Sequence, residues 1–263
     1  MTTKVRLTVF DAGTFTMSKA DLMYGGSGMI TIPSTVAVIE HAHHGLILFD
    51  TGINYRVADP DSGEDYWGPG LRSAYGAQGF TREQAVDAQL VRLGFQLTDV
   101  AYVIYSHLHL DHAGGMGSFP HAVHVVQHDE LRHAWWPDRW TRRGYALNDY
   151  LGSRDFDFLE LSGDVDLFGD GTLRLVRTPG HSPGHQSLIL TLDHHGPVGL
   201  MGDAAHLQEA LDNGVPMVSD WNIGEKMRTY QRLRAYQRQG MPVFLSHEPA
   251  HYATLPHDGD YWD

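Results

Sequence analysis

Three histidines and one aspartate lie within six consecutive positions, in the segment His107-Leu-His109-Leu-Asp111-His112. The segment directly follows Val100–Tyr105, an apolar run that is typical of a buried strand. Imidazole and carboxylate groups at the end of such a strand cost free energy unless they find partners. Metal ions are suitable partners, because both groups bind divalent cations. The segment therefore predicts a metal site rather than a packing role.

The spacing within this segment suits two neighbouring metal ions better than one. On a tight loop, the alternate residues His107 and His109 can point in one direction, while the adjacent Asp111 and His112 point toward a second ion. The segment therefore favours a two-metal site.

Three more candidate ligands follow other expected strands. His181 ends the motif Thr-Pro-Gly-His, Asp203 follows a glycine, and His247 follows a serine. A lone histidine in such a place would more often be a structural residue. Strand ends, however, can converge at one edge of a layered fold. The joint pattern therefore predicts that all seven side chains share one site.

The elements that must position these residues are short runs of β-branched and aliphatic residues, each bounded by Gly, Pro, Asp or His. Strands are expected at Val5–Phe10, Thr35–Glu40, Leu46–Asp50, Val100–Tyr105, Val123–Gln127, Leu173–Arg177, Ser187–Leu192, Val198–Met201 and Val243–Ser246. Together with outer helices they predict two sheets in an α/β or α+β layered domain rather than a barrel. The sequence shows no repeat and no linker-like boundary, so we expect a single domain over residues 1–263.

Two helices are indicated by their patterns. Thr81–Gln84 has the form of a capping box and opens an amphipathic segment that ends at Gly94. An apolar stripe at helical spacing, starting at residue 223, ends at Gly240. The segment Asn54–Thr81 has little periodicity, and we expect a loop or lid whose Tyr66-Trp67 pair covers a pocket or packs on the surface.

The composition bounds the chemistry. Cysteine is absent, which excludes disulfides and thiolate metal sites. The formal charge of −13 repels phosphate backbones and stays negative with two divalent ions bound. We therefore expect a neutral small-molecule substrate and no nucleic acid partner. The N-terminal residues lack an export signal, and no run approaches the ~18 apolar residues of a membrane span. A soluble, cytoplasmic protein with no membrane partner is the resulting expectation.

As a set, the candidate ligands resemble the metallo-β-lactamase superfamily, whose His-x-His-x-Asp-His loop is followed by a later histidine, a later aspartate and a last histidine. The resemblance implies an αββα sandwich of two mixed β-sheets flanked by helices, with a site for two zinc-type ions. It also implies how the ligands divide between the ions: His107, His109 and His181 hold the first, Asp111, His112 and His247 hold the second, and Asp203 bridges them. Asp50, in the strand-end motif Phe-Asp-Thr-Gly, would support the ligands without binding metal.

Longer stretches resemble a narrower group, the quorum-quenching N-acyl homoserine lactonases and their γ-butyrolactonase relatives. These stretches are Ile32-Pro33, Tyr105–His112, Gly117–Pro120, Gly169–Leu173 and Thr178–Ser187. The likeness spans most of the chain. It implies a dinuclear-metal hydrolase that opens the lactone ring of N-acyl homoserine lactones or related γ-lactones, whereas the fold alone does not fix the substrate.

The corresponding hypothesis is that two ions roughly 3.5–4 Å apart share a water molecule, lower its pKa toward ~7 and present a bridging hydroxide to the lactone carbonyl. One ion would polarise the carbonyl oxygen, the other would receive the leaving ring oxygen, and Asp203 would carry the proton. No protein nucleophile is then required, which agrees with the lack of cysteine and of a Gly-x-Ser-x-Gly motif. Zinc is the expected metal, although the same ligands accept iron, manganese or cobalt. The expected catalytic residues are Asp111, Asp203 and His206.

His206 departs from the lactonase pattern, because those lactonases usually carry a tyrosine three positions after the bridging aspartate. An imidazole there can donate a hydrogen bond to the substrate and, if protonated, can give a proton to the departing alkoxide. Organophosphate hydrolases of the same fold look similar at this position, so a phosphotriesterase is the alternative function. A metal-dependent protein that binds its ligand without turnover is the non-enzyme alternative.

Aromatic and methionine side chains are candidates for an apolar groove that takes an acyl chain. At least one of four such side chains is expected to touch the substrate: Met23, Met29, Trp135 and Trp136. Trp140 and Trp221 are further candidates. The alternatives are core packing and a homodimer interface formed by an exposed aromatic cluster.

Overall fold

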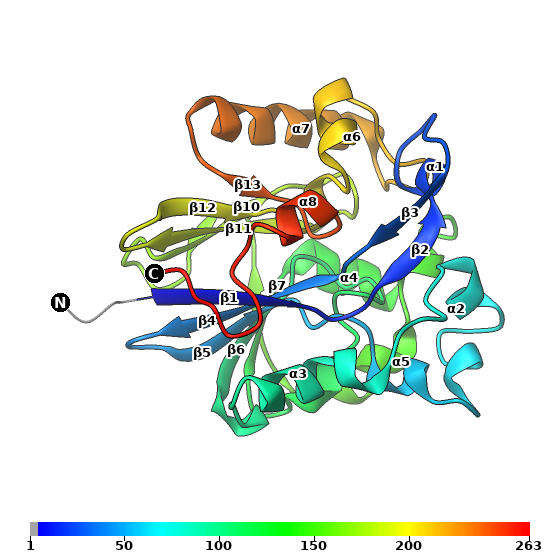
Figure 1. The fold of residues 1–263 in the computed structure, drawn as a ribbon, viewed down its shortest axis with the longest axis horizontal. Coiled ribbons are helices and arrows are strands. Elements are labelled where there is room, and N and C mark those ends of the chain that lie inside the picture. The colour runs from blue at the N-terminus through cyan, green and yellow to red at the C-terminus, as the bar shows by residue number, and fades with distance from the viewer. Residues whose placement is uncertain (1–4) are drawn as a thin grey trace.

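Two β-sheets packed face to face form the centre of the computed structural model, which describes residues 5–263 (Figure 1). The first sheet has six strands in the order β1, β4, β5, β6, β7, β8. Pairing is antiparallel from β1 to β5 and parallel from β5 to β8. The bounds are β1 Val5–Asp11, β4 Thr35–His41, β5 Gly45–Phe49, β6 Val100–Ile104, β7 Val123–Gln127 and β8 Asp157–Leu161.

The second sheet has five strands in the order β13, β12, β11, β10, β9, and a separate hairpin is formed by β2 and β3. In the second sheet only the pair β12–β13 is parallel. The bounds are β9 Val165–Asp166, β10 Leu173–Arg177, β11 Gln186–Leu192, β12 Gly196–Leu200 and β13 Val243–Phe244, with β2 Phe15–Ser18 and β3 Met29–Ile32 in the hairpin. Both large sheets are therefore mixed.

The helices lie on the outer faces of the two sheets. In Figure 1, α6 and α7 cover the five-stranded sheet, while α3 and α5 lie beyond the six-stranded sheet. The α-helices are α1 Lys19–Leu22, α2 Leu71–Ala74, α3 Val86–Arg92, α4 His128–Trp135, α5 Leu147–Tyr150, α6 Gln208–Asn213, α7 Ile223–Arg238 and α8 Pro249–Tyr252. Short 3-10 helices are η1 Tyr55–Ala58, η2 Gly63–Asp65, η3 Arg82–Gln84, η4 Leu97–Asp99, η5 Met116–Ser118, η6 Arg142–Gly144, η7 Leu151–Ser153 and η8 Gly202–Ala204. Within residues 5–263, no helix combines the length and apolarity needed to cross a membrane.

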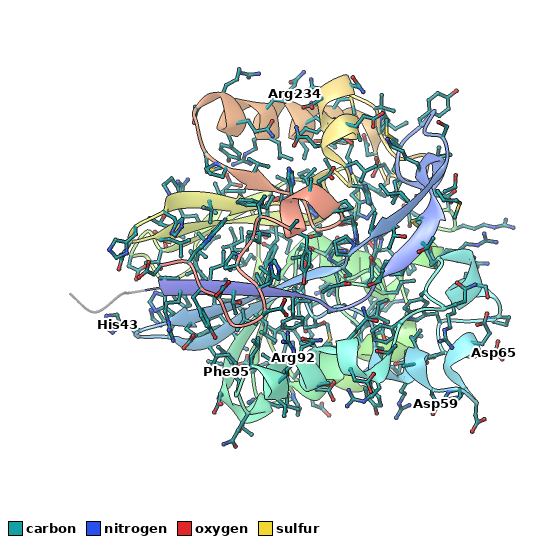
Figure 2. The ribbon with its side chains drawn as sticks, viewed as in Figure 1. His43, Asp59, Asp65, Arg92, Phe95 and Arg234 are labelled. Atoms are coloured by element: carbon teal, nitrogen blue, oxygen red, sulfur yellow. The ribbon has the colours of Figure 1, made fainter. Side chains whose placement is uncertain are left out.

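Strand β4 shows why the six-stranded sheet is buried on both faces. Val36 and Val38 belong to the core between this sheet and α3, whereas Ala37 and Ile39 belong to the core between the two sheets. The alternation follows from the two-residue period of a strand, and an apolar residue at every position is what a doubly covered sheet requires. Figure 2 shows the charged side chains of Asp59, Asp65 and Arg234 on the outside of this layered core.

The expected αββα layering is confirmed. All nine expected strands are present, with ends that differ by at most two residues. Strands β2, β3, β8 and β9 were not expected from the sequence. Strand β8 is a largely exposed edge strand, and each hairpin strand has only four residues, with Thr16 and Thr31 among the apolar ones. Neither pattern gives the continuous apolar run from which the other strands were predicted.

The helix expected from Thr81 is interrupted. The capping box between Thr81 and Gln84 is present, but it closes only the 3-10 helix η3. Ala85 is buried and has extended backbone angles (φ −62°, ψ 145°), so α3 starts at Val86. The second expected helix is confirmed as α7. Its N-cap is Asn222, whose side chain accepts a hydrogen bond from the backbone N–H of Glu225 in the first turn.

The segment 54–81 forms a loop with short helical turns that packs through its aromatic residues. Trp67 is buried, and its ring meets the ring of Tyr75 edge-on at 6.3 Å. Both belong to an apolar cluster with Phe15 and Met17 of the hairpin. The segment is therefore anchored to the β2–β3 hairpin by side-chain packing.

Asp149 in α5 supplies a test of this packing. Both of its carboxyl oxygens are buried and have no hydrogen-bond partner among the residues described. Burial raises the pKa of Asp149 to about 8. The folded protein therefore keeps this proton at neutral pH, whereas the unfolded chain releases it near pH ~4.

We predict that Asp149→Asn stabilises the protein at pH 8 and has little effect at pH 4. Between pH ~4 and about 8 only the folded state retains the proton on Asp149. The contribution of Asp149 to the free energy of unfolding is therefore fully present below pH ~4 and is lost as the pH rises toward about 8. Each kcal/mol recovered corresponds to a rise of roughly 2–4 °C in melting temperature. Thermal unfolding at both pH values, with the exposed Asp155→Asn as control, measures the effect. An equal shift at the two pH values would contradict it.

Candidate metal centre

The loop that follows β6 carries His107, His109, Asp111 and His112, and it is held by Asp50 at the end of the neighbouring strand β5. The backbone N–H of Ser106 donates to Oδ1 of Asp50 at 2.6 Å, and the Ser106 hydroxyl donates to Oδ2 at 2.7 Å. Nδ1–H of His112 donates to the same Oδ2 at 2.8 Å. Asp50 thereby fixes both the start of the loop and the ring of His112.

The turn that presents Asp50 has an unusual backbone. Asp50 has a φ of 65°, a conformation that costs about 1–3 kcal/mol and persists only where the surroundings enforce it. Gly52 also has a positive φ, and a Cβ at this position would lie 2.1 Å from the Cβ of Ala12. Only glycine fits there. The Phe-Asp-Thr-Gly motif is thus a rigid support, in agreement with the role expected for Asp50.

Glu130 of α4 joins this loop to the loop that carries His181. It is fully buried, and its Oε1 accepts the N–H of Leu108 at 3.0 Å. Its Oε2 accepts the hydroxyl of Ser182 at 2.6 Å and the N–H of Gly184 at 3.0 Å. One carboxylate therefore spans the two loops.

His181 follows β10 and is oriented by Asp220. Nδ1–H of His181 donates to Oδ1 of Asp220 at 3.0 Å, which leaves the lone pair of Nε2 directed into the centre. Burial by itself would raise the pKa of Asp220, but Lys226 and His181 hold that pKa below its usual value. The carboxylate is thus ionised beside the imidazole.

Asp203 and His247 follow the adjacent strands β12 and β13. The N–H of Asp203 donates to Nε2 of His185 at 2.9 Å, and Nδ1–H of His185 donates to the hydroxyl of Thr178 at 2.8 Å. His185 therefore has a structural role and fixes the backbone at Asp203. Nδ1–H of His247 donates to the carbonyl of Pro33 at 2.7 Å, which directs its Nε2 into the centre.

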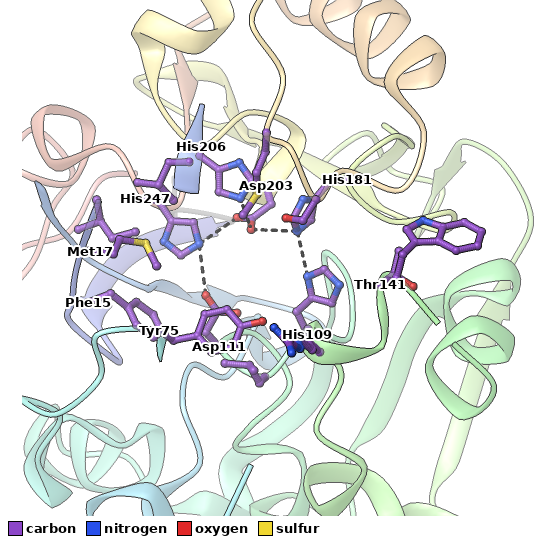
Figure 3. A pocket seen from close by; sticks show the side chains of 18 residues that line it. Phe15, Met17, Tyr75, His109, Asp111, Thr141, His181, Asp203, His206 and His247 are labelled. Atoms are coloured by element: carbon purple, nitrogen blue, oxygen red, sulfur yellow. Dashed lines mark hydrogen bonds and ion pairs between the residues drawn. The ribbon is translucent and has the colours of Figure 1, made fainter. Parts of the chain in front are cut away.

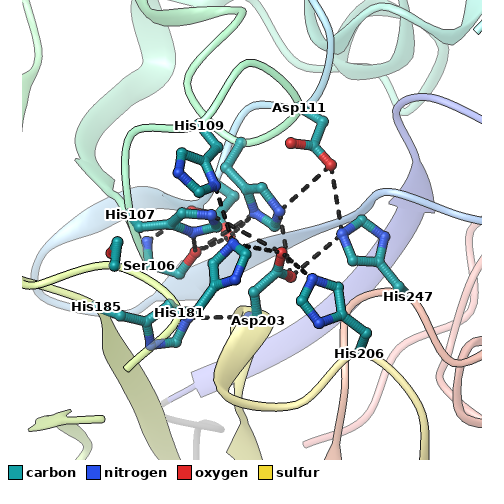
Figure 4. A network of polar contacts seen from close by, with 12 residues as sticks. Ser106, His107, His109, Asp111, His181, His185, Asp203, His206 and His247 are labelled. Atoms are coloured by element: carbon teal, nitrogen blue, oxygen red, sulfur yellow. Dashed lines mark hydrogen bonds and ion pairs between the residues drawn. The ribbon is translucent and has the colours of Figure 1, made fainter. Parts of the chain in front are cut away.

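The two carboxylate oxygens of Asp203 face two different groups of side chains (Figure 4). Oδ2 lies 3.8 Å from Nε2 of His107 and 3.4 Å from Nε2 of His181. The same Nε2 of His181 lies 2.9 Å from Nδ1 of His109. Oδ1 lies 3.3 Å from Nε2 of His112 and 3.2 Å from Nε2 of His247. The structure thus brings together all seven side chains that the sequence proposed as ligands: His107, His109, Asp111, His112, His181, Asp203 and His247.

Asp111 completes the second group, because its Oδ2 lies 3.3 Å from Nε2 of His247 and 3.6 Å from Nε2 of His112. Burial lowers the pKa of His247, but Asp203 and Asp111 outweigh burial and raise that pKa to about 10. Positive charge is therefore strongly favoured at Nε2 of His247, which lies beside both carboxylates.

The donor set fits a pair of cations. Nε2 of His107, Nε2 of His112 and Oδ1 of Asp203 are buried and have no hydrogen-bond partner within residues 5–263. Burial and the neighbouring imidazoles hold the pKa of His107 and of His109 well below the usual value, so both rings are neutral ligands at neutral pH. Neutral imidazoles and carboxylates that converge without other partners are the chemistry of a divalent metal site.

His206 lies at the edge of this centre. Its Nε2 is 3.2 Å from Oδ2 of Asp203, and its ring stacks parallel to that of His247 at 5.6 Å. Burial lowers the pKa of His206 to about 4, against the opposing effect of Asp203. The imidazole is therefore neutral at pH 7, which makes it a hydrogen-bond donor and not the protonated acid that was the other option considered from the sequence.

A cavity of about 300 Å³ opens above the centre. Its walls combine apolar and polar side chains with those of the centre: Phe15, Met17, Leu22, Ile32, Tyr75, Leu110, Trp140, Thr141, Arg143, Met217 and Ser219. Figure 3 shows Phe15, Met17 and Tyr75 on the side of His247 and Asp111, and Thr141 on the opposite side. The cavity thus has an apolar wall next to the second group of ligands.

At least one of Met23, Met29, Trp135 and Trp136 was expected to touch the substrate, and none of the four lines this cavity. Met23 is buried in the cluster beneath the hairpin, and Met29 is 69% exposed. Trp135 packs edge-on against Tyr150 at 5.5 Å, and Trp136 is 74% exposed beside a separate groove on α4. Each is turned away by its position in α4 or the hairpin, and the aromatic and methionine residues that do line the cavity are Phe15, Met17, Tyr75, Trp140 and Met217.

Three supporting residues were missed by sequence reasoning. Glu130, Asp220 and Lys226 are buried charged residues far from the ligands along the chain. A charged residue within an amphipathic helix normally lies in solvent, so the residue type alone gave no signal for Glu130 or Lys226. Only the tertiary contacts identify them.

Comparisons with known proteins agree with this geometry. A sequence profile described as the Metallo-beta-lactamase superfamily matches residues 30–236. The N-acyl homoserine lactonase AttM of Rhizobium radiobacter is 34% identical over 260 residues, which cover 96% of this chain and 97% of the relative. The N-acyl homoserine lactonase AiiA of Bacillus thuringiensis subsp. kurstaki is 30% identical over 226 residues, which cover 84% of this chain and 83% of the relative.

A solved structure of an N-acyl homoserine lactone hydrolase, with the product N-hexanoyl-L-homoserine bound at the catalytic metal center, matches this fold with a TM-score of 0.83. The match has 25% sequence identity and covers 99% of this chain and 100% of the other. The similarity therefore extends over the whole layered fold and is not limited to the ligand loop.

We predict that Asp111→Asn lowers metal content toward one ion per chain and reduces turnover by at least 10-fold while the fold is retained. The hydrogen bonds of Asp50 with Ser106 and His112 are unchanged, so the loop keeps its conformation. Elemental analysis and circular dichroism measure the two effects, with the exposed Asp155→Asn as control. Two metals per chain and full activity in Asp111→Asn would exclude Asp111 as a ligand.

Chelation is predicted to destabilise the protein as well as inactivate it. The ions would draw together ligands from the ends of four strands, and their removal leaves the partly buried Asp111 and the buried Asp203 among imidazoles. Binding energy to the folded state appears as stability. Thermal unfolding with and without a chelator, followed by metal addition, tests this. Identical melting temperatures for both forms would show that no ion joins these strands.

Proposed function

The chain belongs to the metallo-beta-lactamase superfamily, and from this membership we propose that it is a metal-dependent hydrolase that opens the lactone ring of N-acyl homoserine lactones. The observation that carries the proposal is the arrangement of two ligand groups on opposite oxygens of Asp203, at the floor of a partly apolar cavity. The relatives that span nearly the whole chain are N-acyl homoserine lactonases, which supports lactones as the substrate class.

We assign one divalent ion to each ligand group, with Asp203 shared between them. His107, His109 and His181 form the first site, and Asp111, His112 and His247 form the second. When bound, such ions activate a water molecule as the nucleophile and stabilise negative charge that develops on oxygen. Zinc is the metal we propose, since imidazole and carboxylate ligands suit it, and elemental analysis distinguishes it from iron, manganese or cobalt.

Ring opening adds water across the ester bond and yields an alcohol and a carboxylic acid, which ionises to a carboxylate by releasing one proton to solvent. One proton must move from the attacking water to the ring oxygen as it leaves. We assign this transfer to the carboxylate of Asp203, which lines the cavity. Neutral His206 lines the cavity with its Nε2 3.2 Å from Oδ2 of Asp203, and we assign to its Nε2–H a hydrogen bond shared between that oxygen and the substrate.

The cavity walls account for a neutral substrate with an acyl chain. Phe15, Met17 and Ile32 offer apolar surface from the β2–β3 hairpin, and Met217 adds an adaptable side chain. A neutral lactone also enters a protein of formal charge −13 without electrostatic repulsion. The walls thus orient the chain of the substrate while the polar floor receives the ring.

Phosphotriester hydrolysis is the second candidate, because the histidine at position 206 differs from the tyrosine usual in the lactonases that the sequence resembles. A panel of homoserine lactones of varied chain length, γ-butyrolactone and a paraoxon-like ester separates the two functions. The lactonase proposal expects the highest kcat/KM on an acyl homoserine lactone. A higher value on the phosphotriester would overturn it, and tight lactone binding without turnover in metal-replete protein would instead indicate a binding protein.

His206→Ala is predicted to keep both metals and the fold while lowering lactone turnover by roughly 10- to 100-fold, the usual effect of losing one buried hydrogen-bond donor near a developing charge. His206→Tyr should recover part of the loss, because a phenol restores the donor. Steady-state kinetics with the exposed His43→Ala as control measure the difference. Wild-type rates in His206→Ala on every lactone would place this residue outside the reaction.

A further inference from the structure

A fully buried lysine stands behind the candidate metal centre. Lys226 lies in the first turn of α7 and has no solvent exposure. Its Nζ donates to the backbone carbonyl of Asp203 at 2.8 Å and lies 3.1 Å from Oδ1 of Asp220. Burying an ammonium group is costly unless it is paired and hydrogen-bonded, so these two contacts account for its position.

Asp220 connects Lys226 to His181. Its Oδ1 accepts Nδ1–H of His181 at 3.0 Å, and its Oδ2 accepts the N–H of Met217 at 2.9 Å. The ammonium of Lys226 thus touches the support of one ligand and the backbone of another. His181 belongs to the first ligand group, and Asp203 is shared by both.

The loop before His181 is also packed against α7. Gly180 has a φ of +132°, and a Cβ there would lie 2.4 Å from the backbone nitrogen of Lys226. The N–H of Asn222 donates to the carbonyl of Gly180 at 2.9 Å, and the Thr229 hydroxyl donates to the carbonyl of Pro179 at 2.7 Å. The helix and the ligand loop are therefore held at one fixed separation, and Lys226 lies within that contact.

We propose that Lys226 is a positioning residue of the metal centre, which couples the bridging Asp203 to the Asp220–His181 pair and so sets the affinity of the first metal site. The proposal rests on the metal centre of the proposed function but not on the identity of the substrate.

Two effects of the ammonium support this role. Its hydrogen bond fixes the peptide after Asp203, and so fixes the direction of the bridging carboxylate. Its contact with Oδ1 holds the Asp220 carboxylate in place beside His181, where a carboxylate partner orients the imidazole and increases its basicity. Outer partners of this kind typically change metal affinity by about 10- to 100-fold when they are removed.

A purely structural ion pair gives a different expectation. If Lys226 and Asp220 only stabilise the fold, replacing both by neutral residues removes the buried charges together and should restore stability and metal binding alike. If the pair supports the ligands, the double substitution restores stability but leaves metal binding weak. Stability and metal affinity therefore separate the two roles.

The test compares Lys226→Met, Asp220→Asn and the double variant with wild type. The metal-free proteins are titrated with Co²⁺ alone, followed by the visible absorption of the bound ion, and their thermal unfolding is measured. Arg232→Met is the matched control, since Arg232 lies on the same helix and donates to the carbonyl of Arg177 but contacts neither Asp203 nor Asp220.

We expect Lys226→Met to weaken the first cobalt site at least 10-fold and to change its absorption bands, and Arg232→Met to change neither. The double variant should regain the thermal stability that Lys226→Met loses. Its cobalt affinity should stay at least 10-fold weaker than that of wild type, and it should also be weaker than that of Asp220→Asn. If Lys226→Met does not fold, the double variant decides by the same two comparisons. The proposal is overturned if the cobalt affinity of Lys226→Met, or of the double variant, is less than 10-fold weaker than that of wild type. It is also overturned if the double variant binds cobalt as tightly as Asp220→Asn. Wild-type protein that binds no cobalt overturns the metal centre itself, before any variant is compared.

Discussion

The carboxylate of Asp203 meets imidazole nitrogens on both of its oxygens at 3.2 to 3.8 Å, and the rest of the structure depends on this crowding. Buried acceptor atoms repel one another unless positive charge lies among them. The side chains cannot move apart freely, because they come from the ends of β6, β10, β12 and β13 in two packed sheets. Cations at this point therefore complete the sandwich as well as its chemistry.

The ligand loops are fixed from behind by three buried carboxylates, each of which joins different parts of the chain. Asp50 connects β5 to the loop after β6, Glu130 connects that loop to the His181 loop, and Asp220 connects the His181 loop to α7. Each carboxylate accepts several hydrogen bonds, which offsets the cost of its burial. The centre is thus surrounded by a second layer of charge, and this layer transmits the position of the outer helices to the ligands.

The ligands were predictable from the sequence and their supports were not, for a physical reason. His107, His109, Asp111 and His112 follow a strand at close spacing, so their residue types and local pattern already indicate metal chemistry. Glu130 and Lys226 lie on helices where a charged residue is ordinary, and only their burial against loops distant in sequence reveals a role. Residue type alone did not separate Trp140, which lines the cavity, from Met23 and Trp136, which do not, because the direction of each side chain depends on the packing of the hairpin and α4. Strands followed from apolar runs, whereas the break at Ala85 depended on tertiary contacts that no local pattern encodes.

The charge of the chain and the geometry of the cavity lead to one constraint on the proposed reaction. A lactone is neutral, whereas its hydrolysis product carries a carboxylate. Inside the centre, divalent ions held by the buried acids and imidazoles would stabilise that carboxylate. Outside it, the product meets a protein of formal charge −13, which repels anions at distances up to roughly the Debye length. Substrate entry is therefore insensitive to the protein's net charge, while product departure is favoured by it, so an acidic surface suits a hydrolase of this kind better than a basic one.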